Sequence, residues 1–222
     1  MNHAAYMKRF LDFNTQVKDR CGRFVNFQFD HEEARYITFP NHVEERSAFL
    51  RSLISCRSPV IVDAFACVGG DSIALMGDFP DATLYAVQRV HTEVERQRFA
   101  RLTSNVNNYN TVVNQTRTNV LAVDSDIEDF MSAVDRPIDL LYLDPPWEQA
   151  VHGPELGEAD LVANMLELVA LARGVRVVVL KIRNSVSRKS EDLFLTRGYR
   201  LQRSIAVRKA GRVKFYFHVF SK

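Results

Sequence analysis

Asp144-Pro-Pro-Trp147 is the segment whose residue types best suit chemistry on a planar amine. Two successive prolines lack amide donors and restrict the chain to an extended turn, so the Asp144 carboxylate and the Pro145 carbonyl are expected to point outward as acceptors. An exocyclic NH2 group offers two donors, and two acceptors would aim its nitrogen lone pair at an electrophilic carbon. Trp147 would stack on the ring that bears the amine. The candidate catalytic residues are Asp144, Pro145, Pro146 and Trp147; a structural turn with a core tryptophan is the alternative.

A second segment, from Asp63 to Ser72, follows a short apolar run and contains Gly69 and Gly70. Glycines between a strand and a helix let a ligand approach the backbone, and the helix N-terminus beyond them attracts a carboxylate. The Asp63 carboxylate would bind a cationic amino group. The amino-acid tail of S-adenosylmethionine (SAM) carries both groups. The spacing is not Gly-x-Gly-x-x-Gly, which disfavours a dinucleotide, and a purely structural Gly-Gly turn is the alternative.

Both segments follow strands in a chain that alternates strands with helices. Strands are predicted in apolar or alternating runs at 59–65, 82–88, 111–123, 138–144, 175–182, 199–208 and 212–220. The last two are joined by Lys209-Ala-Gly211 as a hairpin. This order predicts an α/β, Rossmann-like fold: a seven-stranded, mostly parallel sheet with a C-terminal antiparallel hairpin. Ligands of such sheets bind beyond the carboxyl ends of the strands.

The N-terminal quarter does not share this alternation. Helical patterns at 4–19 and 42–55 flank an aromatic-rich stretch that contains Phe24, Phe27 and Phe29. These three aromatics alternate as in a strand or an extended arm, where they would belong to the core or cover a bound base. We therefore expect an N-terminal helical and aromatic extension at 1–58 and a Rossmann-like domain at 59–222.

The two motifs, in this order, resemble those of amino-methyltransferases marked by [D/N/S]PP[Y/F/W]. The closer resemblance is to the trimethylguanosine synthase family, which methylates N2 of 7-methylguanosine RNA caps. VDAFACVGGDS is similar to that family's cofactor loop, and residues 30–40 are similar to its acidic segment, which leads to a threonine–proline turn beside the cofactor. Leu180–Asn184 resembles a Lys-x-Pro-x-Asn segment of relatives in large DNA viruses. The resemblance covers roughly residues 27–185. It implies the class I SAM-dependent methyltransferase fold with SAM as cofactor; we expect no metal.

The resemblance also implies which residues bind each group. The cofactor residues would be Thr38, Pro40, Asp63, Phe65, Val68, Gly69, Gly70, Asp71, Ser72, Gln88 and Asn119. The substrate residues would be Trp147, Lys181 and Asn184, with Lys181 either at a cap phosphate or simply a strand-end lysine. Gln88 stands where the family has the acidic residue that binds the SAM ribose. A carboxylate accepts from both ribose hydroxyls, whereas Gln offers one acceptor group and one donor group.

Basic residues gather at the C-terminal end of a chain whose net charge is only +2. Residues 173–222 hold 14 Lys or Arg and two acids, Glu191 and Asp192. A basic segment on a near-neutral chain predicts contact with a nucleic acid, by the resemblance a capped RNA, through residues 173–222. A solvated basic face is the alternative.

The composition is that of an ordinary globular protein, with 46% hydrophobic and 25% charged residues. The sequence shows no apolar run of membrane-spanning length and no apolar signal-peptide core at its start, so we expect no membrane contact. Its three cysteines lack the spacing of metal ligands and suggest a reducing compartment. We expect a cytoplasmic or nuclear location; the oligomeric state stays open.

Three functions fit these observations. The first is a SAM-dependent methyltransferase acting on a nucleobase amine, at N2 of a 7-methylguanosine cap. The second is a methyltransferase acting on adenine N6 or another base amine of a nucleic acid, which the aspartate of Asp-Pro-Pro-Trp suits equally well. The third is a non-catalytic methyltransferase fold that binds RNA or takes part in assembly, which Gln88 favours and the intact Asp-Pro-Pro-Trp disfavours.

Overall fold

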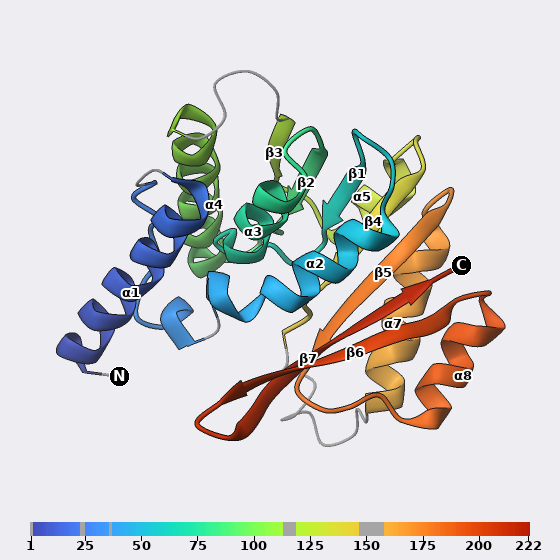
Figure 1. The fold of residues 1–222 in the computed structure, drawn as a ribbon. Helices are drawn as coiled ribbons and strands as arrows, with labels where there is room; N and C mark the ends of the chain where they lie inside the picture. Colours follow the sequence, from blue (N-terminus) through green and yellow to red (C-terminus); the bar gives the residue numbers. More distant parts are fainter. Residues whose placement is uncertain (1, 23–24, 36, 113–118, 147–157) are drawn as a thin grey trace. The chain divides into compact units, whose positions relative to one another are not determined.

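The computed structural model describes residues 2–22, 25–35, 37–112, 119–146 and 158–222 (Figure 1). The chain forms two compact units, and each is described by itself. Unit 1 consists of residues 1–59 and 66–125, and unit 2 of residues 60–65 and 126–222. The boundary expected between residues 58 and 59 stays a prediction.

Seven strands form the sheet, in the order β3-β2-β1-β4-β5-β7-β6. The strands are β1 (Val60–Asp63), β2 (Thr83–Val87), β3 (Asn119–Val123), β4 (Ile138–Leu143), β5 (Val175–Ile182), β6 (Arg200–Lys209) and β7 (Arg212–Ser221). β4 pairs in parallel with β1 and β5, β2 pairs in parallel with β3, and β7 runs antiparallel to both β5 and β6. The predicted α/β class, with a seven-stranded, mostly parallel sheet and a C-terminal antiparallel hairpin, is confirmed.

The helices separate the strands as the alternating pattern predicts. They are α1 (His3–Cys21), α2 (Glu44–Leu53), α3 (Gly70–Asp78), α4 (Glu93–Val112), α5 (Ile127–Ala133), α7 (Glu158–Leu171) and α8 (Arg188–Thr196), with two short 3-10 helices, η1 (Glu33–Arg35) and η2 (Pro40–His42). A capping box begins α4: the Thr92 hydroxyl accepts from the Glu95 amide, and the Glu95 carboxylate accepts from the Thr92 amide. Burial opposes the charge of Glu95, but bonds from Arg89, His91 and Thr92 outweigh it and lower the Glu95 pKa to about 2.

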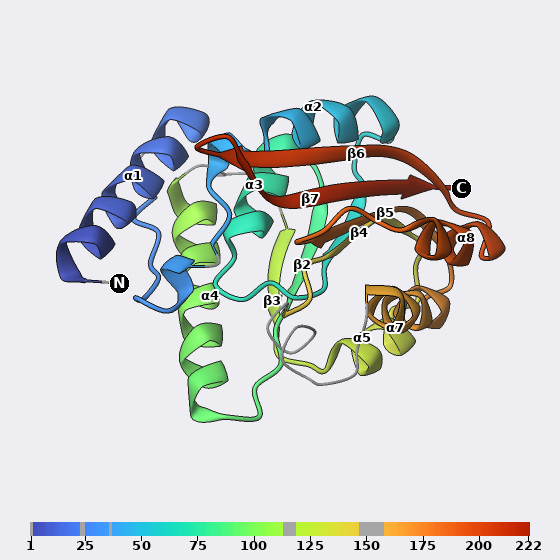
Figure 2. The same ribbon diagram turned by 90° about the horizontal axis from the view of Figure 1, so that it is seen from below.

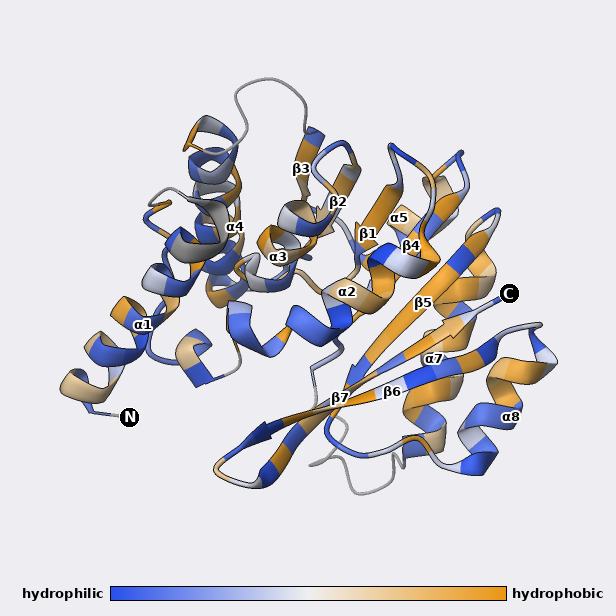
Figure 3. Cartoon of the chain, in the orientation of Figure 1, coloured by the Kyte–Doolittle hydropathy of each residue, from blue (hydrophilic) through white to orange (hydrophobic). Residues whose placement is uncertain are grey.

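In unit 2 the core lies between the strands and the helices α5, α7 and α8. Figure 2 shows these helices on one side of β4, β5 and β7. Phe194 of α8 stacks on Phe220 of β7 with ring centroids 3.7 Å apart. β4 and β5 are apolar and buried almost throughout, as expected for central strands (Figure 3). Because these strands are buried in the hydrophobic core, they fix the position of the sheet edge at which Asp144 follows β4.

In unit 1 the N-terminal aromatics form a core of their own. Phe27 and Phe29 are 0% and 3% exposed and lie 4.8 and 5.5 Å from the ring of Phe13 on α1. They belong to a segment outside any strand, where the Asn14 side chain donates to the Phe27 carbonyl and accepts from its amide. The alternation therefore indicated burial rather than a strand, and neither ring is placed to cover a base. Phe24 lies outside the described residues.

No helix in the described ranges is both long enough and apolar enough to span a membrane.

Candidate functional site

Asp144 and Lys181 form an ion pair at the carboxyl ends of two neighbouring strands in unit 2. Leu143, the last residue of β4, pairs with Leu180 of β5, so the next residues on each strand lie side by side. The Lys181 Nζ is 2.5 Å from the Asp144 Oδ2, and the two side chains are 1% and 24% exposed. The ammonium is buried, whereas the carboxylate is partly open to solvent. The pair therefore presents a negatively charged acceptor at this edge of the sheet.

Lys181 was expected to be either a phosphate ligand or a strand-end lysine. Its buried ammonium contacts Asp144 and lies 5.1 Å from the centroid of the Phe215 ring, which is not a position open to a cap phosphate. Of the two alternatives the structure gives the strand-end lysine, one residue before the end of β5, and it pairs this lysine with the predicted catalytic carboxylate. Pro145 is buried and Pro146 exposed. Trp147 lies outside the described residues, and its stacking role stays a prediction.

Asp63 shares this edge with Asp144. Asp63 ends β1 and pairs in register with Tyr142 of β4, two residues before Asp144. Its side chain is nearly fully buried, at 1% exposure. The register therefore brings together one predicted cofactor residue and one predicted catalytic residue on adjacent strands. Phe65, which follows shortly after, is half-buried.

Asn184 is held by a buried histidine that sequence reasoning missed. The Nε2 of His218 lies 3.1 Å from the Asn184 carbonyl oxygen, and its Nδ1 lies 2.8 Å from the Ser204 hydroxyl. A carbonyl can only accept, so Nε2 carries the proton, and Nδ1 of the neutral ring accepts from Ser204. Burial lowers the His218 pKa, partly opposed by the Asn184 carbonyl and the charge of Glu158. The neutral ring anchors the backbone just beyond β5 and leaves the Asn184 side chain exposed.

The glycine loop in unit 1 follows the predicted strand-to-helix path. Gly69 has φ of 91° and caps α3 without a side-chain hydrogen bond, while Cys67 has φ of 51°. A Cβ on Gly69 would lie 2.9 Å from the Leu102 Cδ1, and one on Gly70 would lie 2.9 Å from the Ile37 Cγ1. Gly69 is therefore required by its backbone conformation, whereas a side chain at Gly70 would have to displace Ile37. The first amides of α3 have no intrahelical acceptor, which suits a carboxylate ligand.

Gln88 contacts this loop through its amide oxygen and the neighbouring Arg89 through its amide nitrogen. Its Oε1 accepts from the Cys67 amide at 3.1 Å, and its Nε2 donates to the Arg89 carbonyl at 2.9 Å. The amide explains how a glutamine can stand at the end of β2, because it binds two backbone groups at once. Its role at the SAM ribose stays a prediction, and one lone pair of Oε1 is left over for it.

Asn105 joins three segments of unit 1 and was not among the predicted site residues. This fully buried side chain on α4 donates to the Val68 carbonyl at 2.9 Å and the Gln28 carbonyl at 2.8 Å, and it accepts from the Gln28 amide at 2.7 Å. One turn earlier, Arg101 binds Glu33 and Asp30 at 2.6 and 2.9 Å. The acids of the 30–40 segment thus anchor it to α4, and Asn105 positions the loop from Val68 onward.

Asp71 was predicted to bind the cofactor but is paired with Arg46. The Arg46 Nη1 lies 2.7 Å from the Asp71 Oδ1, and its Nη2 lies 3.8 Å from the Asp78 Oδ2. The Arg46 side chain is completely buried. The pair ties α2 to the first turn of α3 and neutralises a carboxylate that would otherwise repel an anionic ligand at that helix end. Arg46 stands in a polar helix pattern that gives no sign of its burial.

The remaining predicted cofactor residues occupy different places in unit 1. Thr38 is buried, Pro40 begins η2, Ser72 is buried in α3 and Asn119 is the exposed first residue of β3. Their contacts with SAM stay predictions.

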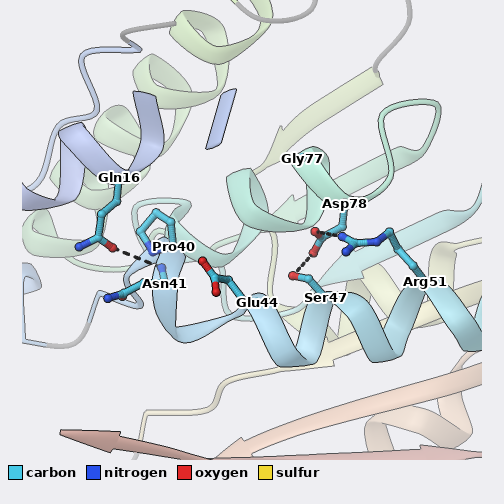
Figure 4. Close-up of a pocket in the computed structure, with 8 residues that line it drawn as sticks. All are labelled: Gln16, Pro40, Asn41, Glu44, Ser47, Arg51, Gly77 and Asp78. Carbon is cyan, nitrogen blue, oxygen red and sulfur yellow. Dashed lines mark hydrogen bonds and ion pairs between the residues drawn. The ribbon is translucent and has the colours of Figure 1, made fainter. Parts of the chain in front are cut away.

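A cleft of about 480 Å³ lies elsewhere in unit 1, between α1, η2, α2 and α3 (Figure 4). Its polar groups bind one another: Asp78 accepts from Ser47 at 2.5 Å and from Arg51 at 2.8 Å. Its lining contains Pro40 but none of the glycine-loop residues. We therefore do not assign the cofactor to this cleft. The described residues contain no group of three or more His, Cys, Asp or Glu that could hold a metal ion.

Solved structures with the same architecture come from several methyltransferases. The METTL16 methyltransferase domain, in a delta-N form, matches with a TM-score of 0.67 and 14% identity over 99% of this chain and 98% of that one. A methyltransferase from Pyrococcus furiosus matches with a TM-score of 0.63 and 17% identity over 99% and 98% of the two chains. The magnesium protoporphyrin IX methyltransferase ChlM from Synechocystis, solved with bound SAM, matches with a TM-score of 0.56 and 15% identity over the full length of both.

The chain has the class I methyltransferase fold. At these identities the likeness concerns the fold, and no family model and no curated protein sequence matches the chain. In the methyltransferase fold the carboxyl ends of β1 and β4 face the same edge of the sheet, where Asp63 and Asp144 lie. Function within a shared fold is decided by such residues rather than by the fold itself.

Proposed function

We propose that the chain is a SAM-dependent methyltransferase that acts on an exocyclic amine of a nucleobase in a nucleic acid. The observation that carries this proposal is the Asp144 carboxylate, partly open at the carboxyl end of β4 and paired with a buried lysine. A fixed carboxylate at this edge of a class I methyltransferase fold suits an amine substrate. The amine offers N–H donors to the carboxylate and gains positive charge as it is methylated.

Asp144 would accept a hydrogen bond from the amine and hold its nitrogen in line with the methyl group. Lys181 would keep the carboxylate ionised and correctly placed, since the ammonium lies 2.5 Å away. The Pro145 carbonyl is the second expected acceptor, and Trp147 the expected stacking surface. Bound SAM would supply an electrophilic methyl group: the amine nitrogen would bond to it as the methyl–sulfonium bond breaks and S-adenosylhomocysteine leaves, and the methylated amine would then lose a proton to solvent.

The cofactor would be held by residues of the Asp63–Ser72 segment. Asp63 would bind the amino group of the SAM tail, and the amides at the start of α3 would bind its carboxylate. Cys67, Gly69 and Gly70 shape the loop between them, and Gln88 holds that loop through the Cys67 amide.

Two bases are candidates for the acceptor. The resemblance to trimethylguanosine synthases favours N2 of a 7-methylguanosine cap. Asp144 itself favours adenine N6, because the cap family more often has serine in that place and the ion pair with Lys181 is built around a carboxylate. The non-catalytic alternative depends on Gln88, whose amide is engaged by the Cys67 amide and the Arg89 carbonyl.

The test measures transfer of a labelled methyl group from SAM to defined RNAs. One RNA carries a 7-methylguanosine cap and no adenosine, and a second carries adenosine and no cap; nucleoside analysis locates the methyl group. Asp144→Asn is expected to lower transfer on the order of 100-fold, as for loss of one electrostatic group in a preorganised site. Asp135→Asn, an exposed aspartate just before β4, is the matched control and is expected to leave transfer unchanged. Methyl groups found on ribose hydroxyls, or full activity of Asp144→Asn, would contradict the proposal.

A further inference from the structure

The β6–β7 hairpin extends beyond the edge of the sheet at which Asp144 lies. β5 ends at Ile182, which pairs with Tyr216, but β7 begins four residues earlier at Arg212 and β6 continues to Lys209. At ~3.3 Å per residue, the two strands project about 13 Å past the end of β5. We call residues 207–215 the overhang; Figure 1 shows it continuing beyond the β5 arrowhead. Because β4 and β5 are parallel, the overhang projects from the sheet edge at which both of these strands have their carboxyl ends.

The overhang is strongly basic. It carries Arg208, Lys209, Arg212 and Lys214, the first three exposed, and the sequence from 199 to 222 contains no acidic residue. Within the part of the chain that the structure describes, Arg208, Lys209 and Arg212 form no ion pair. The end of β6 and the start of β7 are correspondingly hydrophilic in Figure 3. Such a set of charges attracts a polyanion.

The overhang is a paired ribbon rather than a loose loop. Its strands pair up to Lys209 and Arg212, and Ala210 and Gly211 close it with φ of 49° and 77°. Two successive positive φ values are those of a tight two-residue hairpin turn. Pairing shifts by one residue between Val207 opposite Phe215 and Arg208 opposite Val213, which leaves Lys214 as the extra residue of a β-bulge. A bulge increases the local twist and re-aims the side chains beyond it.

The base of the overhang is joined directly to the candidate site. Phe215 lies under the Lys181 ammonium, 5.1 Å from Nζ to the ring centroid. His218 on β7 and Ser204 on β6 hold the Asn184 backbone through the hydrogen bonds described above. The overhang therefore starts from a fixed base beside Lys181, Asp144 and Asn184, and its direction relative to these residues is defined.

We propose that the overhang is a docking arm for the phosphodiester backbone of the nucleic acid whose base reaches Asp144. The proposal rests on the proposed function for the choice of ligand and narrows the basic segment 173–222 to one ribbon. A strand that rises ~3.4 Å per nucleotide places about four phosphates along about 13 Å. Lys209 and Arg212 stand opposite each other at the last pairing of the ribbon, with Arg208 one residue before and Lys214 at the bulge, so the four basic side chains gather near its tip to meet these phosphates. The overhang would contact phosphates and not base edges, so it would position the strand without reading its sequence.

The experiment compares two triple variants of equal charge. The overhang variant is Arg208→Gln, Lys209→Gln and Arg212→Gln. The control variant is Arg173→Gln, Arg188→Gln and Lys189→Gln, which removes three exposed charges of the same basic segment away from the hairpin. Binding of a fluorescent 20-nucleotide RNA, and of DNA of the same sequence, is followed by anisotropy from low to high salt. Circular dichroism and melting confirm that each variant is folded.

The overhang variant is expected to bind at least tenfold more weakly at low salt. Its slope of log affinity against log salt should be shallower by about 2, because three contacts with a single strand each contribute ~0.7. The control variant should lie close to the wild type. A loss confined to RNA or to DNA would identify the nucleic acid and support the arm. Equal losses in both variants, no loss in the overhang variant, or no binding by the wild type would overturn it.

Calorimetry with SAM on the same proteins separates this inference from the proposed function. The overhang variant should bind SAM as the wild type does. Wild-type RNA binding that depends on the overhang, without any SAM binding, would uphold the arm and defeat the methyltransferase proposal. SAM binding with no effect of the overhang on nucleic acid would do the reverse.

Discussion

At the residue scale, the Asp144–Lys181 pair is unequal in its surroundings. Lys181 is 1% exposed, whereas Asp144 is 24% exposed and can be hydrated when its partner is removed. Removing Asp144 and removing Lys181 should therefore change the stability of the protein by different amounts. A buried charge left without its partner is far more destabilising than a partly exposed one.

Asp144→Ala should therefore destabilise the protein more than Lys181→Met. We expect a loss of about 3 kcal/mol in the free energy of unfolding for Asp144→Ala, which removes the carboxylate partner of a buried ammonium. Lys181→Met should lose about 1 kcal/mol or less, because methionine fills the apolar space beside Phe215 and water reaches Asp144. Urea denaturation measures both, and the double variant should recover most of the loss caused by Asp144→Ala. The opposite order would show that the ammonium is not the buried member.

Gln88 makes a second prediction at this scale, about affinity for SAM. Gln88→Glu keeps an acceptor for the Cys67 amide and offers a charged acceptor to a ribose hydroxyl. A hydrogen bond to a charged group is worth ~1.5–3 kcal/mol, so SAM should bind about tenfold or more tightly. Gln88→Leu, which removes the hydrogen bonds to Cys67 and Arg89, is the control and should weaken binding. Unchanged or weaker binding by Gln88→Glu would mean that another residue binds the ribose.

At the element scale, the sequence predicted what periodicity encodes. The strands were expected near their observed positions, because buried runs and Gly or Pro breaks leave a clear trace; the exception is the run 111–123, whose first two residues end α4 and in which β3 begins only at Asn119. The polar residues that lock elements together leave none. Arg46, Asn105 and His218 stand in ordinary helix or strand patterns, and their burial depends on partners far along the chain, such as Gln28 for Asn105. The candidate site was therefore predicted as two motifs but not as a supported arrangement.

His218 links β7 to the segment after β5 and gives a pH dependence. Burial lowers its pKa in the folded state below the ordinary value of 6.5, so the unfolded chain binds the proton more readily. Stability should be complete above about pH 6.5 and fall as the pH drops below it. His218→Gln keeps a donor for the Asn184 carbonyl but cannot titrate. The free energy of unfolding of the wild type, relative to that of His218→Gln, should fall from pH 7.5 to pH 5.5; a constant or rising difference would contradict this account.

At the scale of the whole molecule, fold and charge carry different information. The fold is shared with methyltransferases only 14–17% identical in sequence, so the likeness shows the fold and neither the reaction nor the acceptor. The charge distribution is particular to this chain: residues 173–222 hold 14 of its 29 basic residues and two of its 27 acids. The acceptor is thus argued from Asp144 and from the basic overhang rather than from the fold.

The most direct test of the central claim is calorimetric titration of the folded wild-type protein with SAM and with S-adenosylhomocysteine. A methyltransferase that uses Asp63 and the start of α3 as proposed must bind SAM whatever its substrate is, so the test needs no substrate. We predict saturable binding of both compounds at one site per chain, with adenosine alone binding more weakly because it lacks the amino-acid tail that those groups hold. Absence of binding heat for both compounds, on protein shown to be folded by circular dichroism, would contradict the enzymatic account and favour a non-catalytic nucleic-acid-binding protein.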